Sequence, residues 1–217
     1  MGQGPGGPAE TPRLTGGSMV TLFVSTFIKF FFLLTPFFVL STFLAMTKNF
    51  TQKQRTTLAV KVTVAVLVVA LVIFGAGNFV FQVFGITLDA FRIGTGLLLL
   101  LTAIQLVNGN NQAESADSAD NIAVVPLAIP VTVGPATTGA LLVMGGESHG
   151  AADLLVILSA IAAAILLVGL FLLGSAHVER LVKKQGLVIL SKITGLILAA
   201  LAAQLVMLGV QPFFYRT

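Results

Sequence analysis

The sequence predicts an all-α membrane protein with six transmembrane helices, arranged as two inverted three-helix repeats in which helices 1 and 4 are broken by Pro and Gly. The first observation is composition. Hydrophobic residues make up 56% of the chain, charged residues 9%, and the mean hydropathy is +1.02, whereas a soluble domain carries about 25% charged residues. The second is that six apolar stretches reach the roughly 20 residues needed to cross a bilayer. The third is that the second half of the chain resembles the first.

The repeat has a constant offset and no gap. The segments Thr95-Gly96-Leu97 and Ala103-Ile104-Gln105-Leu106-Val107 return as Thr194-Gly195-Leu196 and Ala202-Ala203-Gln204-Leu205-Val206, and 204 − 105 = 99. The same offset relates Pro36 to Pro135, Gly75 to Gly174, Ala65 to Ala164 and Leu71 to Leu170. Because each copy holds three spans, an odd number, the second copy enters the membrane from the opposite side. An inverted repeat of this kind is a known architecture of secondary transporters.

The six predicted spans follow one another along the chain at about 20–46, 58–80, 90–108, 121–144, 153–176 and 187–210. Residues 1–18 are rich in Gly and Pro and are expected to be a disordered tail, or a tag remnant ahead of a native start at Met19. The remaining predicted units are a first repeat over 19–108, an acidic cytoplasmic linker over 109–120, a second repeat over 121–210 and a short tail over 211–217.

Basic residues in the short loops predict the orientation in the membrane. Lys48, Lys53, Arg55 and Lys61 follow the first span, and Arg180, Lys183, Lys184 and Lys192 follow the fifth. The loops between spans 2 and 3 and between spans 4 and 5 hold only Arg92. With six spans, both basic loops lie on the cytoplasmic side and both termini lie outside. The expected location is the inner membrane of a prokaryotic cell.

Polar and helix-breaking residues gather at two places inside the spans. These residues are Thr35 and Pro36 in the first span, and Pro126, Pro130, Thr132, Gly134, Pro135, Thr137 and Thr138 in the fourth. Pro removes a backbone donor, so three prolines within ten residues make a continuous helix over 121–144 very unfavourable. Backbone groups freed inside a membrane must line an enclosed cavity. A new helix start there suits a carboxylate, and the freed carbonyls suit an ammonium group.

The predicted substrate-binding residues are therefore Thr35, Pro36, Thr132, Gly134, Pro135, Thr137 and Thr138, with Gln105 and Gln204 at matching positions of spans 3 and 6. The alternative for the prolines is a pair of simple kinks. For the glutamines the favoured alternative is structural, because a Gln within a span most often forms a hydrogen bond to a neighbouring helix. The repeated glycines, Gly75, Gly96, Gly174 and Gly195, are expected to permit close helix packing. Lys29, a charge within a span, is either functional or extends to the membrane surface from near the outer end of its helix.

Several classes of function are excluded by the residues that the chain lacks. It has no Cys, so thiolate metal sites and disulfides are absent. It has no His-Glu-x-x-His, no Gly-x-Ser-x-Gly and no phosphate-binding loop, so we expect no enzyme activity, cofactor or metal. The net charge of +4 is small and lies in the loops, which does not indicate nucleic-acid binding.

In its apolar segments the chain resembles the MarC family, an inner-membrane group within the LysE-type transporter superfamily. The resemblance covers about 20–210 and rests on TPFFVLSTFLAMTKNFT, FGITLDAFRIGTGLLLLLTAIQLV, NIAVVPLAIPVTVGPATTGALLV and ITGLILAALAAQLVMLGV. One departure is Thr35, which stands where the family usually has Asn or Asp. The resemblance implies a secondary transporter of small neutral amino acids such as glycine, alanine, serine or threonine.

The expected partners are thus a small zwitterionic amino acid and the lipid bilayer, with proton or sodium coupling and the oligomeric state left open. A first alternative is a passive channel or an exporter of drugs and other small molecules, for which the Phe-rich first span is suitable. A second is a membrane assembly protein that transports nothing. In that case the glycine-lined helix faces would serve subunit packing.

Overall fold

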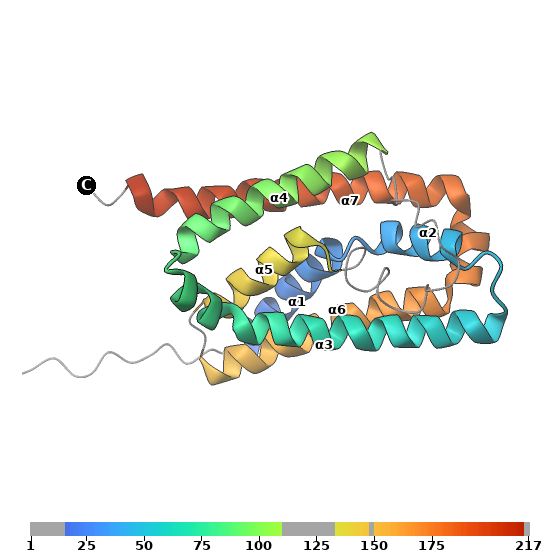
Figure 1. Cartoon of the computed structure of the whole chain (residues 1–217), viewed down its shortest axis with the longest axis horizontal. Helices are drawn as coiled ribbons and strands as arrows, with labels where there is room; N and C mark the ends of the chain where they lie inside the picture. Colours follow the sequence, from blue (N-terminus) through green and yellow to red (C-terminus); the bar gives the residue numbers. More distant parts are fainter. Residues whose placement is uncertain (1–15, 110–132, 148–149, 215–217) are drawn as a thin grey trace, which may run out of the picture.

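The computed structural model describes residues 16–109, 133–147 and 150–214, and every regular element in these ranges is an α-helix. The helices pack side by side in an elongated bundle, with α4 and α7 along one side and α3 and α6 along the other (Figure 1). Their bounds are α1 Gly16–Leu33, α2 Pro36–Met46, α3 Gln52–Phe84, α4 Leu88–Asn108, α5 Pro135–Gly146, α6 Ala151–Leu173 and α7 Ser175–Phe214.

Five helical segments within the described ranges are long and apolar enough to cross a membrane. They are Ser18–Met46, Gln52–Phe84, Leu88–Asn108, Ala151–Leu173 and Gln185–Phe214. The all-helical membrane class is therefore confirmed, but the structure gives five candidate spans where the sequence predicted six. Half of the predicted fourth span, 121–144, lies outside the described residues. Its described part, α5, has 12 residues and is about 18 Å long, too short to cross a core of about 30 Å by itself.

The first span is broken as predicted. Helix α1 ends at Leu33, and α2 begins at Pro36. Pro is well suited to the first position of a helix, because the amide that it lacks has no intrahelical partner there. Its ring also disfavours helical geometry in the preceding residue, and Thr35 has left-handed backbone angles of φ 48° and ψ 56°. The break thus lies at Thr35 and is held by Pro36.

A network of hydrogen bonds holds the turn between α2 and α3. The Thr51 hydroxyl accepts from the amide of Gln54, and the Thr51 amide donates to the Gln54 side chain at 2.9 Å. From α3, Arg55 donates through Nε to the carbonyl of Thr47 at 3.0 Å and through a terminal nitrogen to that of Lys48 at 3.4 Å. The Arg55 cation interacts favourably with the negative end of the α2 dipole, and its hydrogen bonds to the last carbonyls stabilise the tight turn.

The connection between α6 and α7 differs from the prediction. The sequence suggested a basic loop between spans at 153–176 and 187–210, whereas Gly174 is the one residue between the two helices. The segment 175–186 contains no proline, so nothing in it interrupts helical hydrogen bonding. The predicted tails over 1–18 and 211–217 are likewise too long, since Gly16–Leu33 and Ser175–Phe214 are helical.

Helix α4 packs along α7 through two glycines. A Cβ built on Gly96 would lie 2.9 Å from the carbonyl oxygen of Ala202, and one built on Gly195 would lie 2.9 Å from that of Ala103. The prediction of close helix packing is confirmed for these two positions. It is wrong for Gly75, which has no neighbour within 4 Å of such a Cβ because it faces outward from α3.

Gly174 also differs from that prediction, because it follows the last residue of α6 and its amide donates to the carbonyl of Leu170 at 2.9 Å. The glycine therefore ends a helix. It does not lie at a contact between two packed helices.

The two ends of the bundle carry different charges. The turn between α2 and α3 and the junction of α6 and α7 lie at the same end (Figure 1), which brings Arg55 and Arg180 to that end. At the opposite end, Arg92 at the start of α4 forms ion pairs with Asp89 at 2.9 Å and with Glu147 at 2.7 Å. The sequence assigned both basic segments to one side of the membrane, and their common position agrees with that assignment.

Candidate functional site

One hydrogen bond joins the break in the first span to the start of α5. The hydroxyl of Thr137 donates to the backbone carbonyl of Leu33 at 3.3 Å, and the bond is buried. In an unbroken helix this carbonyl would accept from the amide of Phe37, but the break removes that partner. Thr137 therefore supplies a donor to a backbone acceptor that would otherwise be unpaired inside the membrane.

Thr35 occupies a strained backbone conformation at this point. A β-branched residue with positive φ is a clear outlier, and such a residue costs on the order of 1–3 kcal/mol. Thr35 is buried and does not cap α2 with its side chain. Its own amide donates to the carbonyl of Phe32, and its carbonyl accepts from the amide of Val39. Backbone strain of this kind is concentrated at functional sites.

The start of α5 is similar. Gly134 precedes the helix in an extended conformation, and Pro135 occupies the first helical position. The amide of Thr138 already donates to the carbonyl of Gly134 at 2.9 Å. The two amides between them, those of Ala136 and Thr137, have no intrahelical acceptor. The equivalent amides at the start of α2 are those of Phe37 and Phe38, so each helix start offers two backbone donors and the positive end of a helix dipole.

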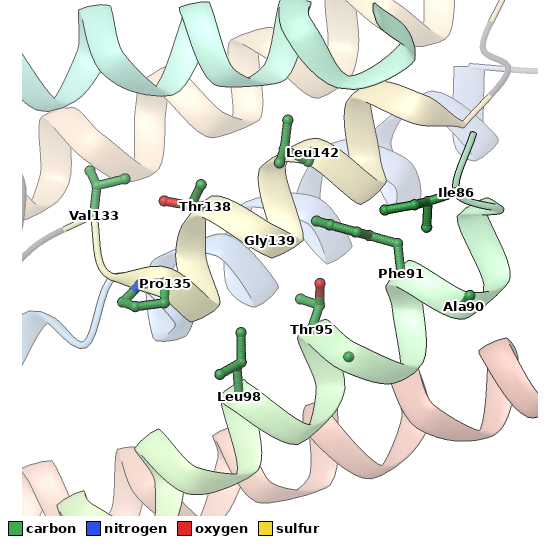
Figure 2. A pocket seen from close by; sticks show the side chains of 11 residues that line it. Ile86, Ala90, Phe91, Thr95, Leu98, Val133, Pro135, Thr138, Gly139 and Leu142 are labelled. Atoms are coloured by element: carbon green, nitrogen blue, oxygen red, sulfur yellow. The ribbon is translucent and has the colours of Figure 1, made fainter. Parts of the chain in front are cut away.

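An open cavity of about 920 Å³ lies between α4 and α5, and we refer to it as the α4–α5 cavity. Figure 2 shows Phe91, Thr95 and Leu98 projecting from α4 toward α5. The hydroxyl groups in its lining are those of Thr95 and Thr138, and none of the 11 lining residues is charged. The cavity is therefore mostly apolar with two hydroxyls.

Thr95 was not among the predicted site residues. It is buried in α4, and a Cβ built on Gly139 would lie 2.6 Å from its hydroxyl oxygen. Only a glycine at 139 thus lets α5 approach this hydroxyl. The signal in the sequence was the duplicated Thr-Gly pair at 95–96 and 194–195, which predicted a repeat and close packing at its glycines.

A second cavity, of about 260 Å³, lies where α1, α5 and α7 meet, and we refer to it as the Lys29 cavity. Its polar lining residues are Ser25, Thr26, Lys29, Glu147 and Gln204. The prediction that Lys29 lies near the outer end of its helix is wrong, because α1 begins at Gly16, thirteen residues earlier (29 − 16 = 13) or about 20 Å.

The structure brings together some of the predicted site residues. Thr35, Pro36 and Thr137 are buried at the break, while Gly134, Pro135 and Thr138 form the start of α5 beside the α4–α5 cavity. Both glutamines are exposed. Gln204 lines the Lys29 cavity, whereas Gln105 on α4 lines neither cavity. Thr132, Pro126 and Pro130 lie outside the described residues. Within the described ranges, no group of His, Asp and Glu side chains is arranged to hold a metal ion.

Comparison with known proteins gives a consistent picture. A family model described as the MarC family integral membrane protein matches residues 20–214. The chain is 34% identical to the UPF0056 membrane protein MJ1677 of Methanocaldococcus jannaschii over 142 residues, which are 62% of this chain and 69% of the relative. It is 32% identical to the UPF0056 membrane protein YhcE of Escherichia coli over 147 residues, 64% of this chain and 68% of the relative.

A third relative comes from another archaeon. It is the UPF0056 membrane protein PH0760 of Pyrococcus horikoshii, 34% identical over 152 residues that make up 67% of this chain and 73% of the relative. No solved structure is significantly similar to the chain. The names of these relatives describe membrane proteins and state no substrate.

Proposed function

Because the chain belongs to the MarC family of integral membrane proteins, we propose that it is a secondary transporter of small neutral amino acids in a prokaryotic inner membrane. The observation that carries the proposal is the buried hydrogen bond from Thr137 to the carbonyl of Leu33. It brings the start of α5 against a break in the first span. A break of this kind inside a membrane segment is the usual form of a transporter binding site.

The chemistry of the two helix starts suits a zwitterion. The amides of Phe37 and Phe38, and those of Ala136 and Thr137, are donors for a carboxylate. Each helix end would stabilise a carboxylate by about 0.3–2 kcal/mol, depending on burial. Backbone carbonyls at the end of α1 would accept from the ammonium group. Thr35 and Thr138 add hydroxyls at the two breaks.

The inverted repeat is part of the proposal, and the helix bounds support it. Helix α2 begins at residue 36 and α5 at 135, while α3 begins at 52 and α6 at 151, so that both differences are 99. The contacts of α4 with α7 are also reciprocal. Gly96 packs on Ala202 and Gly195 packs on Ala103, which is the exchange that a two-fold axis produces.

The proposed topology has six spans. The predicted fourth span, 121–144, is represented among the described residues by α5, whereas α1 and α2 together make up the first. The end of the bundle that carries Arg55 and Arg180 would face the cytoplasm. Both chain termini would then lie outside. Uptake measured with and without proton and sodium gradients determines the coupling ion.

A second candidate, an exporter of larger apolar molecules, is favoured by one observation. The α4–α5 cavity has a volume of about 920 Å³ and an apolar lining that includes Phe91 and Leu98. Cavities of about 300–1,000 Å³ with a few polar groups commonly hold drug-sized ligands. This candidate predicts competition by lipophilic compounds and none by alanine.

The deciding experiment is uptake of labelled glycine, alanine and serine into proteoliposomes, with and without proton and sodium gradients. Saturable uptake that unlabelled alanine accelerates from the inside identifies a carrier, whereas flux without saturation or counterflow identifies a channel. Protein-free vesicles give the background, and the Thr102→Val variant serves as a control because this hydroxyl donates only to Leu98 within α4. Absence of uptake of all three amino acids above background would contradict the proposal.

A further inference from the structure

Lys29 lies close to the middle of the first span. The apolar segment Ser18–Met46 has its midpoint at residue 32, since (18 + 46)/2 = 32. Lys29 lies eleven positions after Ser18 in the helix, a rise of about 16 Å, or half of a typical hydrocarbon core. Charged side chains at this depth are costly and usually face the interior of the protein or a water-filled path. A position this deep therefore calls for a polar environment around the ammonium group.

The Lys29 cavity supplies such an environment. Six residues of α1 line it at spacings of three and four, so that one face of this helix borders the cavity: Leu22, Ser25, Thr26, Lys29, Phe30 and Leu33. Gln204 of α7 contributes an amide, and Glu147 at the end of α5 also borders the cavity. Lys29 and Gln204 are both exposed, so these two groups are accessible from outside the helix bundle. The cavity thus combines a cation with hydroxyl and amide groups.

The ammonium group of Lys29 has no carboxylate partner among the described residues. The ion pairs within 4.0 Å in these ranges are those of Arg92 with Asp89 and with Glu147. Glu147 is held by Arg92 at 2.7 Å, so the acid in the lining of this cavity is already paired with a different cation. The cavity therefore has a cation that can bind an anionic ligand.

The cavity also reaches the break in the first span. Leu33 lines it and provides the carbonyl that accepts from Thr137. Lys29 precedes Leu33 by four residues, which places its backbone about 6 Å away along the helix axis. The backbone of Lys29 thus lies about one helical turn from the Leu33 carbonyl at the break, on the helix face that borders the cavity.

We propose that Lys29, with Thr26 and Gln204, forms a binding subsite for the carboxylate group of a small solute on its path to the broken helices. The inference rests on the proposed transport function for the identity of the solute, an amino acid. The ammonium ion provides the charge-assisted hydrogen bond, and Thr26 and Gln204 provide further donors. Sequence reasoning could not assign this role, because the cavity is formed by helices far apart in the chain.

The first test measures binding directly, without transport. The chain has no cysteine, so the Ser25→Cys variant places a single thiol in the lining of the cavity. The rate of its reaction with a methanethiosulfonate reagent is measured in nanodiscs with alanine, propionate or propylamine. We expect alanine and propionate to slow the reaction and propylamine to have no effect. Equal protection by all three, or by none, would overturn the proposal.

The role of Lys29 is then tested by substitution in the same background. Adding Lys29→Gln should raise the alanine concentration needed for half-protection by about tenfold or more, as expected for loss of a hydrogen bond from a charged group, whereas Lys29→Arg should retain protection. The matched control is Lys61→Gln on α3, an exposed lysine that does not line the cavity. If Ser25→Cys does not fold, Ala140→Cys reports on the same cavity from α5.

A lipid phosphate could satisfy the same cation, so the nanodiscs are prepared with either zwitterionic or anionic lipid. Slowing by anionic lipid alone, with no effect of propionate, would assign Lys29 to lipid and overturn the proposal. The uptake assay separates the two levels of inference. Normal uptake with unchanged KM in Lys29→Gln would refute the subsite and leave the transport function intact. Lys29-dependent protection without any uptake would support the subsite and refute the transport function.

Discussion

The hydroxyl of Thr137 lies 3.3 Å from the carbonyl oxygen of Leu33, 104 positions earlier in the chain. This hydrogen bond is a direct link between the broken first span and the start of α5. Both ends of the bond are buried, so its loss would leave the carbonyl without a donor in a membrane interior. The link makes Thr137 a structural part of the proposed site as well as a contributor of its amide.

Replacing Thr137 by Val should lower the stability of the protein by about 1 kcal/mol, because interhelical hydrogen bonds in membranes contribute about 0.6 to 2 kcal/mol. It should also reduce uptake, since the two helix starts lose their fixed separation. Thr137→Ser keeps the hydroxyl and should restore both properties. Thermal unfolding in detergent and uptake in proteoliposomes provide the measurements. Equal stability of Thr137→Val and the unchanged protein would show that this bond contributes nothing.

The two prolines at the helix starts should respond alike. Pro36→Ala and Pro135→Ala each remove the ring that keeps the preceding residue out of helical geometry, so each lets a helix extend across its break. Displacement of the binding amides should lower uptake by about tenfold or more, with thermal stability unchanged or raised. Normal uptake by both variants in proteoliposomes would refute a binding site at the breaks.

The glycine contacts provide a matched pair of stability tests. A methyl group on Gly96 would meet Val206 and the carbonyl of Ala202 at less than 3 Å, so Gly96→Ala should cost about 1–3 kcal/mol. Gly75→Ala meets no atom within 4 Å and should be neutral or stabilising by up to about 1 kcal/mol, because Ala favours helix more than Gly. Thermal unfolding of the two variants, measured in parallel, should therefore show shifts of opposite sign or very different size.

The orientation can be measured with single cysteines on intact cells. Lys53→Cys, near the start of α3, lies at the basic end of the bundle, and Ala151→Cys, at the start of α6, lies at the other end. Since the basic end is proposed to face the cytoplasm, an impermeant maleimide should label Ala151→Cys and should label Lys53→Cys only after the cells are permeabilised. Labelling in the reverse order would place both termini in the cytoplasm.

The sequence predicted the parts of the fold that depend on local chemistry. Apolar length located the five candidate spans of the described residues, and the positions of Pro36 and Pro135 predicted where α2 and α5 begin. The helix ends were less accurate, because helices continue past the apolar segment into polar residues. Helix α3 begins at Gln52 where the prediction was 58, and α7 begins at Ser175 where it was 187. Neither polar extension contains a proline to stop it.

The parts that the sequence did not predict depend on which helix faces meet. Gln105 and Gln204 are equivalent in the repeat, yet only Gln204 lines a cavity with Lys29. Thr95 lies opposite Gly139 because α4 packs against α5, and local sequence patterns do not predict which helices pack together. The same holds for Lys29, whose depth and surroundings become clear only when the start of α1 and the position of α7 are known. The sequence thus predicted the residues at the breaks and Gln204, but it did not predict the contribution of Thr95 on α4.

The length of α7 has a mechanical consequence. This helix has 40 residues and is about 60 Å long, twice the thickness of a hydrocarbon core. It begins next to Gly174 at the basic end and packs through Gly209 against the backbone of Asp89 at the other end. This continuous helix connects the α6–α7 junction at one end of the bundle with the start of α4 at the other. Displacement of the α6–α7 junction would therefore be transmitted to the Asp89–Arg92–Glu147 ion pairs at the opposite end.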